Sequence, residues 1–168
     1  MTKVVNINSI RFMILVLVQA IICNHINFLG FINPYIYIIF LLLYPINNNR
    51  QLFLVISFVL GLSIDVFSDT AGVHATASLC IAYVRPIVLK LVYRVQYEHQ
   101  NMRLYALGSW LLIYYIMVIT ILHHFVLFTL EIFSLNNILL ISKKALLSSI
   151  FTILLSTVLI FLFRRSKV

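Results

Sequence analysis

Long apolar runs separated by short polar segments are the feature that most limits what this chain can fold into. The 168 residues are 63% hydrophobic and 10% charged, whereas soluble domains average about 45–50% apolar and about 25% charged residues. A helix needs about 20 mostly apolar residues to cross the hydrocarbon core of a bilayer. This pattern predicts an all-α, polytopic integral membrane protein that forms a single transmembrane domain over residues 1–168.

Six transmembrane helices are predicted from the apolar runs. Their approximate bounds are 10–29, 31–46, 52–67, 71–85, 104–128 and 145–163. Proline removes a backbone donor and restricts the residue before it, so we expect Pro86 to end or bend the fourth helix. The residues after it place apolar and charged side chains on different helical faces, which predicts an amphipathic segment over 86–98 on the inner membrane surface.

The second apolar run is short, because Pro34 and Pro45 bound only 12 residues. A helix of that length extends about 18 Å, less than the roughly 30 Å core of a bilayer. The run could thin the bilayer locally, gain length over 31–46, or pack as a partly buried helix. Pro34 suits the first turn of a helix, and the tyrosines near the ends of the run, at 35, 37 and 44, are expected at the membrane interfaces.

The net charge of +8 comes from Lys and Arg residues at the ends of the apolar runs. They are not interleaved with aromatic residues as in a nucleic-acid site, so we expect a bilayer and no nucleic acid as the partner. In the predicted topology one side holds ten of them: Lys3, Arg11, Arg50, Arg85, Lys90, Arg94, Arg103, Arg164, Arg165 and Lys167. The positive-inside rule then predicts that both termini are cytoplasmic and that the turn near Asp65 faces outward.

Neither a metal, a cofactor nor a catalytic site is predicted. Cys23 and Cys80 lie in apolar runs without metal-ligand spacing, and the bulky residues before Cys23 favour a retained first helix over a cleaved leader. His123 and His124 are adjacent and would point about 100° apart on a helix, so we interpret them as an interfacial pair. The few acids form no catalytic pair, and no nucleotide-binding or hydrolase motif is present.

The stretch from Gly61 to Tyr83 holds half of the four acids and several small residues. Charges between two apolar segments cost free energy, so Asp65 is expected to have a defined role. It could pair with His74, or it could cap the start of the fourth helix, where Asp69 or Thr70 competes for the same role.

Small residues recur on one face of the predicted fourth helix, and such faces let helices approach closely in lipid. The fourth helix is therefore expected to be central and to pack on the third helix or on a partner. Gly61 and Asp65 share a face of the third helix, and Gly72 suits the turn. The small residues on the face of the fourth helix are Ala71, Ala75, Ser78 and Ala82.

The pattern G-L-x-x-D followed by G-x-H-A and a later A-Y resembles the MreD family of rod-shape-determining membrane proteins of bacteria. The resemblance extends to the Asn-Pro restart after the first helix, to the length and to the predicted topology. The matching positions are Pro34, Gly61, Leu62, Asp65, Gly72, His74, Ala75 and Tyr83.

The resemblance implies a non-enzymatic scaffold in the bacterial cytoplasmic membrane. MreD-like proteins work with the single-span protein MreC, with MreB filaments, and with RodA and penicillin-binding proteins that make lateral peptidoglycan. From the residues alone we expect partner binding through the small-residue face, and a possible homodimer. The alternative is a substrate-binding subunit of a vitamin-type transporter, with a pocket near Asp65, His74 and His25.

Overall fold

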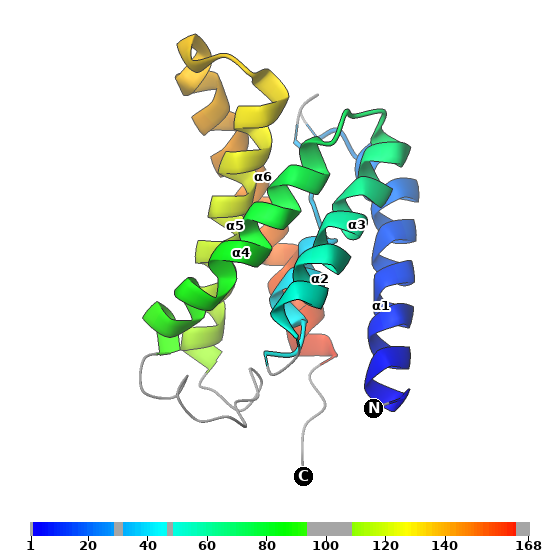
Figure 1. The fold of residues 1–168 in the computed structure, drawn as a ribbon. Helices are drawn as coiled ribbons and strands as arrows, with labels where there is room; N and C mark the ends of the chain where they lie inside the picture. The colour runs from blue at the N-terminus through cyan, green and yellow to red at the C-terminus, as the bar shows by residue number, and fades with distance from the viewer. Residues whose placement is uncertain (1, 29–31, 47–48, 94–108, 164–168) are drawn as a thin grey trace.

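The computed structural model describes residues 2–28, 32–46, 49–93 and 109–163, which form a bundle of helices (Figure 1). Five helices in this part are long and apolar enough to cross a membrane: α1 (Thr2–Ile21), α3 (Arg50–Ser68), α4 (Val73–Tyr93), α5 (Ser109–Ile132) and α6 (Ile138–Leu162). Three shorter elements are α2 (Ile38–Leu43) and the 3-10 turns η1 (Cys23–His25) and η4 (Leu135–Asn137). The all-α class is confirmed, and the multi-pass character is supported.

Helices that follow one another in the chain pack side by side, α3 on α4, α4 on α5 and α5 on α6, while α1 lies against α3. The predicted central position of α4 is therefore confirmed. In Figure 1 the beginning of α1 and the end of α6 lie at the same end of the bundle. The assignment of that end to the cytoplasm stays a prediction.

The segment between α1 and α3 differs most from the prediction. Over 31–46 we expected a membrane-spanning helix, but the structure has only the six residues of α2, flanked by non-helical backbone. We call residues 32–44 the central segment. Five non-helical positions at about 3.3 Å each and eight in helical turns at about 1.5 Å each extend about 28 Å, close to the thickness of the hydrocarbon core.

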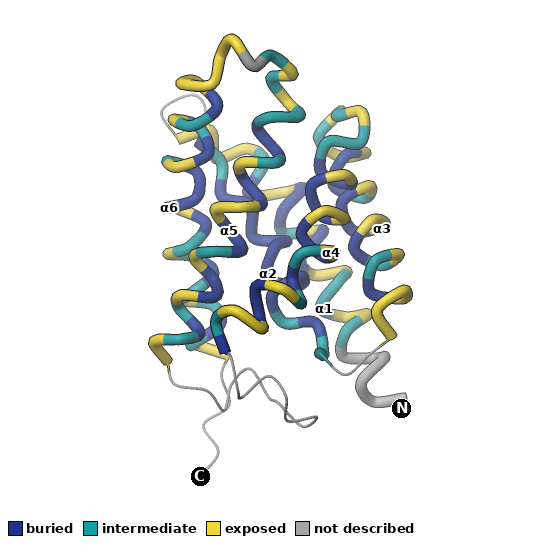
Figure 2. The backbone as a smooth tube through the Cα atoms, turned by 60° about the vertical axis from the view of Figure 1, so that its left-hand side comes forward, coloured by how far each residue is buried: buried dark blue, intermediate teal, exposed yellow. Residues whose placement is uncertain are grey.

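Protein surrounds the central segment. Residues 38–42 are all buried, and Figure 2 shows α2 as a dark, buried stretch inside the bundle. A helix that is apolar on every side is stable only when other elements cover it. The expectation of a partly buried helix is therefore closest to the structure, although the burial is nearly complete.

The fourth helix is longer than predicted. It continues through Pro86 to Tyr93, so the expected end at residue 85 is wrong. Val88, Leu89 and Tyr93 are buried, and this packing holds the second half of α4 in place although proline removes one backbone donor. The predicted surface segment over 86–98 is therefore wrong for residues 86–93, and 94–98 lie outside the described residues.

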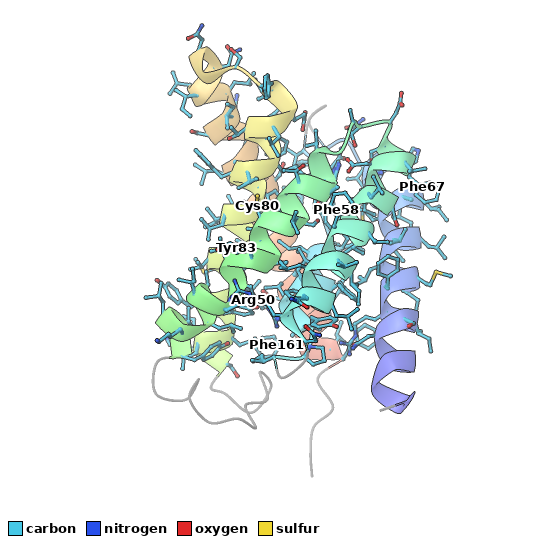
Figure 3. All side chains as sticks on the ribbon, viewed as in Figure 1. Arg50, Phe58, Phe67, Cys80, Tyr83 and Phe161 are labelled. Atoms are coloured by element: carbon cyan, nitrogen blue, oxygen red, sulfur yellow. The ribbon has the colours of Figure 1, made fainter. Side chains whose placement is uncertain are left out.

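The outward faces of α3 and α4 are apolar. Phe58 and Phe67 on α3 and Tyr83 on α4 are exposed, and they lie on the outer side of the bundle in Figure 3. Apolar side chains on an outer face suit contact with lipid tails. The other two predicted spans, 104–128 and 145–163, correspond to α5 and α6, which extend further towards the turn that joins them; residues 104–108 lie outside the described part.

Candidate functional site

The corner between α3 and α4 is organised by the carboxylate of Asp65. The backbone N–H of His74 donates to Oδ1 at 2.9 Å, and the N–H of Ala75 donates to Oδ2 at 2.8 Å. Both N–H groups belong to the first turn of α4 and would have no partner within the helix. A side chain from α3 therefore caps α4, and its negative charge lies at the positive end of the helix dipole.

Asp65 also binds two side chains. The Thr70 hydroxyl donates to Oδ1 at 2.5 Å, and His74 Nδ1 lies 3.0 Å from the same oxygen. Both predicted roles of Asp65, the pairing with His74 and the capping of the fourth helix, are confirmed. Asp69 is exposed and instead ends α3 in a left-handed conformation, with φ of 53°.

Two glycines shape the same corner. A Cβ on Gly61 would lie 2.5 Å from the Cα of Ala75 and closer still to the carbonyl oxygen of His74. Only a residue without a side chain lets α3 and the first turn of α4 touch here. Gly72 has φ of +84°, which favours glycine, so its predicted place in the turn is confirmed.

The small-residue face packs inside the chain. Ala75, Ser78 and Ala82 are buried, and α4 lies between α3 and α5. Ala71 is not on this face, because it lies exposed in the turn before α4. The prediction that this face binds a partner is therefore wrong, because the protein's own helices cover it.

The remaining residues of the MreD-like pattern are spread over the molecule. Pro34 is buried in non-helical backbone, so its expected place in the first turn of a helix is wrong. Tyr83 is 57% exposed, and the guanidinium of Arg50 lies 5.1 Å from the centre of its ring. Leu62 is also exposed. Pro34, Leu62 and Tyr83 are thus not part of the corner between α3 and α4. The other residues of the pattern meet there: Gly61, Asp65, Gly72, His74 and Ala75.

A second cluster of polar rings lies in the centre of the bundle. Tyr35 and Tyr37 are buried, as are His123 and His124, so the expected interfacial positions of all four are wrong. The Tyr37 hydroxyl lies 2.9 Å from His123 Nε2, and the Tyr35 ring centre lies 5.2 Å from that of His124. The His74 ring lies against both tyrosines, 5.7 and 5.9 Å between centres, and so joins this cluster to the corner.

Side chains from α1 and α6 satisfy the non-helical backbone of the central segment. Gln19 Oε1 accepts from the N–H of Ile36 at 2.8 Å, and Gln19 Nε2 donates to the carbonyl of Pro34 at 3.2 Å. The N–H of Tyr35 donates to Thr152 Oγ1 at 3.0 Å. Backbone groups at membrane depth need such partners, because lipid tails offer none.

His124 holds the hydroxyl of Thr152 in the required orientation. His124 Nδ1 lies 2.8 Å from the carbonyl oxygen of Thr120, which can only accept, so Nδ1 carries the proton. Nε2 then accepts, at 3.1 Å, from the Thr152 hydroxyl. The hydroxyl oxygen is thereby left to accept the N–H of Tyr35.

The other end of the central segment is held by Arg85, which is only 3% exposed. Its Nη2 donates to the carbonyls of Leu42 at 3.1 Å and Tyr44 at 2.6 Å, and its Nε donates to the hydroxyl of Tyr115 at 2.8 Å. These carbonyls lie at the C-terminal end of α2, where a cation is favourable. The charge count treated Arg85 as a surface residue, which is wrong; the apolar residues on both sides of it are the signal of a longer α4.

Gln19, Thr152 and Arg85 thus hold the central segment inside the bundle, and we call these three residues the clamp. In the part of the chain that the structure describes, no three His, Cys, Asp or Glu residues are placed to hold a metal ion. Comparisons with protein-family models, curated proteins and solved structures find no match. The features that bear on function are therefore the corner between α3 and α4, the surface of the bundle and the sequence pattern.

Proposed function

We propose that this protein is a non-enzymatic scaffold of the bacterial cytoplasmic membrane, an MreD-like subunit of the cell-elongation machinery. It binds an MreC-like single-span protein and supports lateral peptidoglycan synthesis together with RodA, a penicillin-binding protein and MreB filaments. The observation that carries the proposal is the use of the pattern residues at the corner. Gly61, Asp65 and His74 all serve the contact between α3 and α4, which is what a fold-defining motif of a scaffold requires.

The alternative, a vitamin-type binding subunit, has less support. It needs several polar groups that converge on a ligand within an apolar cavity. Both oxygens of Asp65 accept hydrogen bonds from the chain itself, and His74 is paired with Asp65. His25, the third expected member, is exposed at η1. These groups are used by the fold and do not point together at one site.

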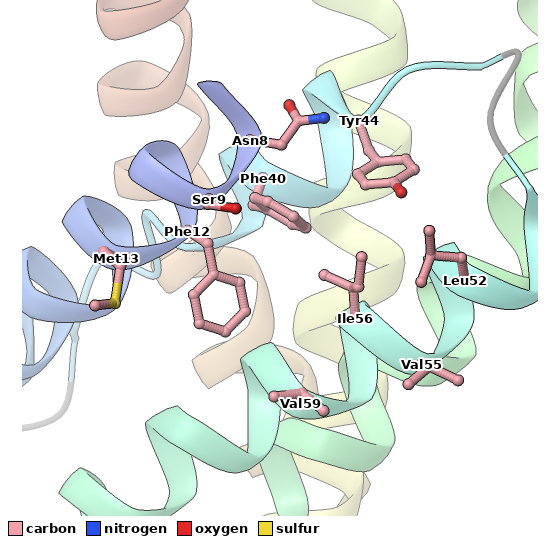
Figure 4. A pocket seen from close by; sticks show the side chains of 10 residues that line it. All are labelled: Asn8, Ser9, Phe12, Met13, Phe40, Tyr44, Leu52, Val55, Ile56 and Val59. Atoms are coloured by element: carbon pink, nitrogen blue, oxygen red, sulfur yellow. The ribbon is translucent and has the colours of Figure 1, made fainter. Parts of the chain in front are cut away.

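The partner needs a surface other than the small-residue face, and α1 and α3 provide one. They border an apolar groove of about 460 Å³, with Phe40 and Tyr44 at its floor (Figure 4). We call it the α1–α3 groove. Its polar lining residues, Asn8 and Ser9, are uncharged. A single transmembrane helix suits such a groove, because apolar packing and uncharged polar contacts drive helix association in lipid.

The first test is depletion of the protein in its native host, with cell shape followed by microscopy and membrane complexes captured in parallel. Rounded cells, together with loss of the MreC-like protein from the captured elongation complex, are expected. Normal shape combined with a vitamin-uptake defect would overturn the proposal and favour the binding subunit.

A matched pair of variants tests the position of the partner. Val59 lines the α1–α3 groove, so Val59→Trp fills it and should reduce capture of the MreC-like protein about tenfold or more, as expected when a packed interface loses about 1.4 kcal/mol or more. Val66 lies on the same helix, is 75% exposed and does not line the groove, so Val66→Trp should leave capture unchanged. Equal capture by both variants would show that the partner binds elsewhere.

A further inference from the structure

A second groove runs along the other side of α1. It has a volume of about 380 Å³ and lies between α1 and α6, with the central segment at its floor; we call it the α1–α6 groove. Its lining is apolar apart from one residue. The lining residues are Arg11, Ile14, Leu15, Val18, Ile36, Ile39, Leu43, Leu159, Ile160 and Phe163.

The groove spans about two thirds of one lipid leaflet. From Arg11 to Val18 the axis of α1 rises about 10 Å, while one leaflet contributes about half of a roughly 30 Å core. Phe163, the residue that follows α6, lines the groove together with Arg11. The cation therefore lies at the end of the groove where α6 ends, and the apolar lining continues from there towards the middle of the bundle.

The charge of Arg11 is not used within the part of the chain that the structure describes. Arg50 stacks on Tyr83, and Arg85 makes three hydrogen bonds. Arg11 has no hydrogen-bond or ion-pair partner among the described residues. It is half-buried beside an apolar groove. A ligand with an anionic group and an apolar chain could pair with the guanidinium and fill the groove at the same time.

We propose that the α1–α6 groove binds one anionic phospholipid. The phosphate pairs with the guanidinium of Arg11, and one acyl chain lies over Ile36, Ile39 and Leu43 of the central segment. The lipid fills the space between α1 and α6 and covers the outer side of the central segment. The α1–α3 groove supplies the internal contrast, because it has Asn8 and Ser9 and no cation in its lining. The charge of the lining therefore distinguishes the two grooves. The α1–α6 groove, which contains Arg11, suits an anionic lipid, and the α1–α3 groove suits an uncharged transmembrane helix.

The test uses the purified full-length protein in nanodiscs that contain equal amounts of phosphatidylglycerol and phosphatidylcholine. After release into detergent, native mass spectrometry counts the lipids that stay bound. The wild-type protein should retain phosphatidylglycerol in preference to phosphatidylcholine. Arg11→Gln should lower the retention of phosphatidylglycerol about fivefold and leave that of phosphatidylcholine unchanged, since one cation near an anionic lipid is worth about 1 kcal/mol.

Two further variants make the outcome decisive. Lys90→Gln removes an exposed cation from the last turn of α4, outside the groove, and should change neither lipid. Ile14→Trp fills the groove from its 53% exposed position and should lower the retention of phosphatidylglycerol while Arg11 is kept. Equal retention of both lipids by the wild type, or no effect of Arg11→Gln, would overturn the proposal.

Discussion

Replacing Asp65 by alanine should weaken the fold strongly, because it leaves the first turn of α4 without a cap. The N–H groups of His74 and Ala75 lose their acceptor, and a buried donor without a partner costs about 1–3 kcal/mol. Taking about 2 kcal/mol for each gives a loss of about 4 kcal/mol in the free energy of unfolding. For a chain of this size, about 2–4 °C per kcal/mol corresponds to a fall in Tm of about 8–16 °C.

The chain contains its own reporter for this measurement. Cys23 is buried, whereas Cys80 is exposed, so a Cys80→Ser background leaves one thiol that reacts only when the fold opens. Cys23 lies next to Asn24, whose Nδ2 donates to Ser68 Oγ at 2.9 Å, and so it is close to the end of α3 that carries Asp65. A thiol-reactive fluorescent dye added during a temperature ramp then gives Tm in detergent.

Two variants complete the series. Asp65→Asn keeps one acceptor oxygen but places an amide donor against a backbone donor, so its loss should be smaller than that of alanine, about 1–3 kcal/mol. Asp69→Asn changes an exposed acid in the same turn and should stay within about 0.5 kcal/mol of the parent. A fall in Tm below about 3 °C for Asp65→Ala, or an equal fall for Asp69→Asn, would refute the capping argument.

The same dye assay tests the other contacts. Gly61→Ala puts a Cβ against the backbone of α4 and should cost about 1–3 kcal/mol or more; an unchanged Tm would contradict the close approach. Arg85→Met leaves the carbonyl of Tyr44 without its donor and that of Leu42 with only the Tyr115 hydroxyl, and we expect a loss of about 1–3 kcal/mol or more. Combined with Tyr115→Phe, it should lose less than the two single losses added, by about 1 kcal/mol, because the hydrogen bond from Arg85 Nε to the Tyr115 hydroxyl is already lost in either single variant. Strict additivity would argue against a shared network. Gln19→Met should lower Tm by several degrees, whereas the exposed control Gln51→Met should not; equal effects would rule out the role of Gln19 in the clamp.

Much of the fold was predictable because membrane insertion depends on the length and apolarity of single segments. The five long helices follow from runs of about 20 apolar residues, and the link between Asp65 and His74 follows from the scarcity of charges. Gly61 and Ala75 were predicted to allow close packing because they are small. The fourth helix was expected to pack either on the third helix or on a partner, and in the structure α4 packs on α3.

The errors have a common physical origin, which is that sequence alone does not show what covers a residue. Tyr35, Tyr37 and His123 carry polar atoms and were placed at interfaces, yet they contact one another inside the bundle. Arg85 was counted as a surface cation, although its partners are carbonyls more than 40 positions earlier in the chain. The partners of these residues are distant in sequence, and local patterns do not report them.

The central segment also constrains the order in which the chain can fold during translation. Tyr35 is synthesised before the hydroxyl that accepts its N–H, because that hydroxyl belongs to Thr152, 117 positions later. Until the ribosome has released most of α6, that peptide group has no acceptor, and bare peptide groups are unstable in hydrocarbon. We therefore expect the segment to stay in contact with water or protein, in the insertion channel or at the membrane surface, until α6 is inserted. Helix α6 thus closes the bundle over a segment that is translated long before it.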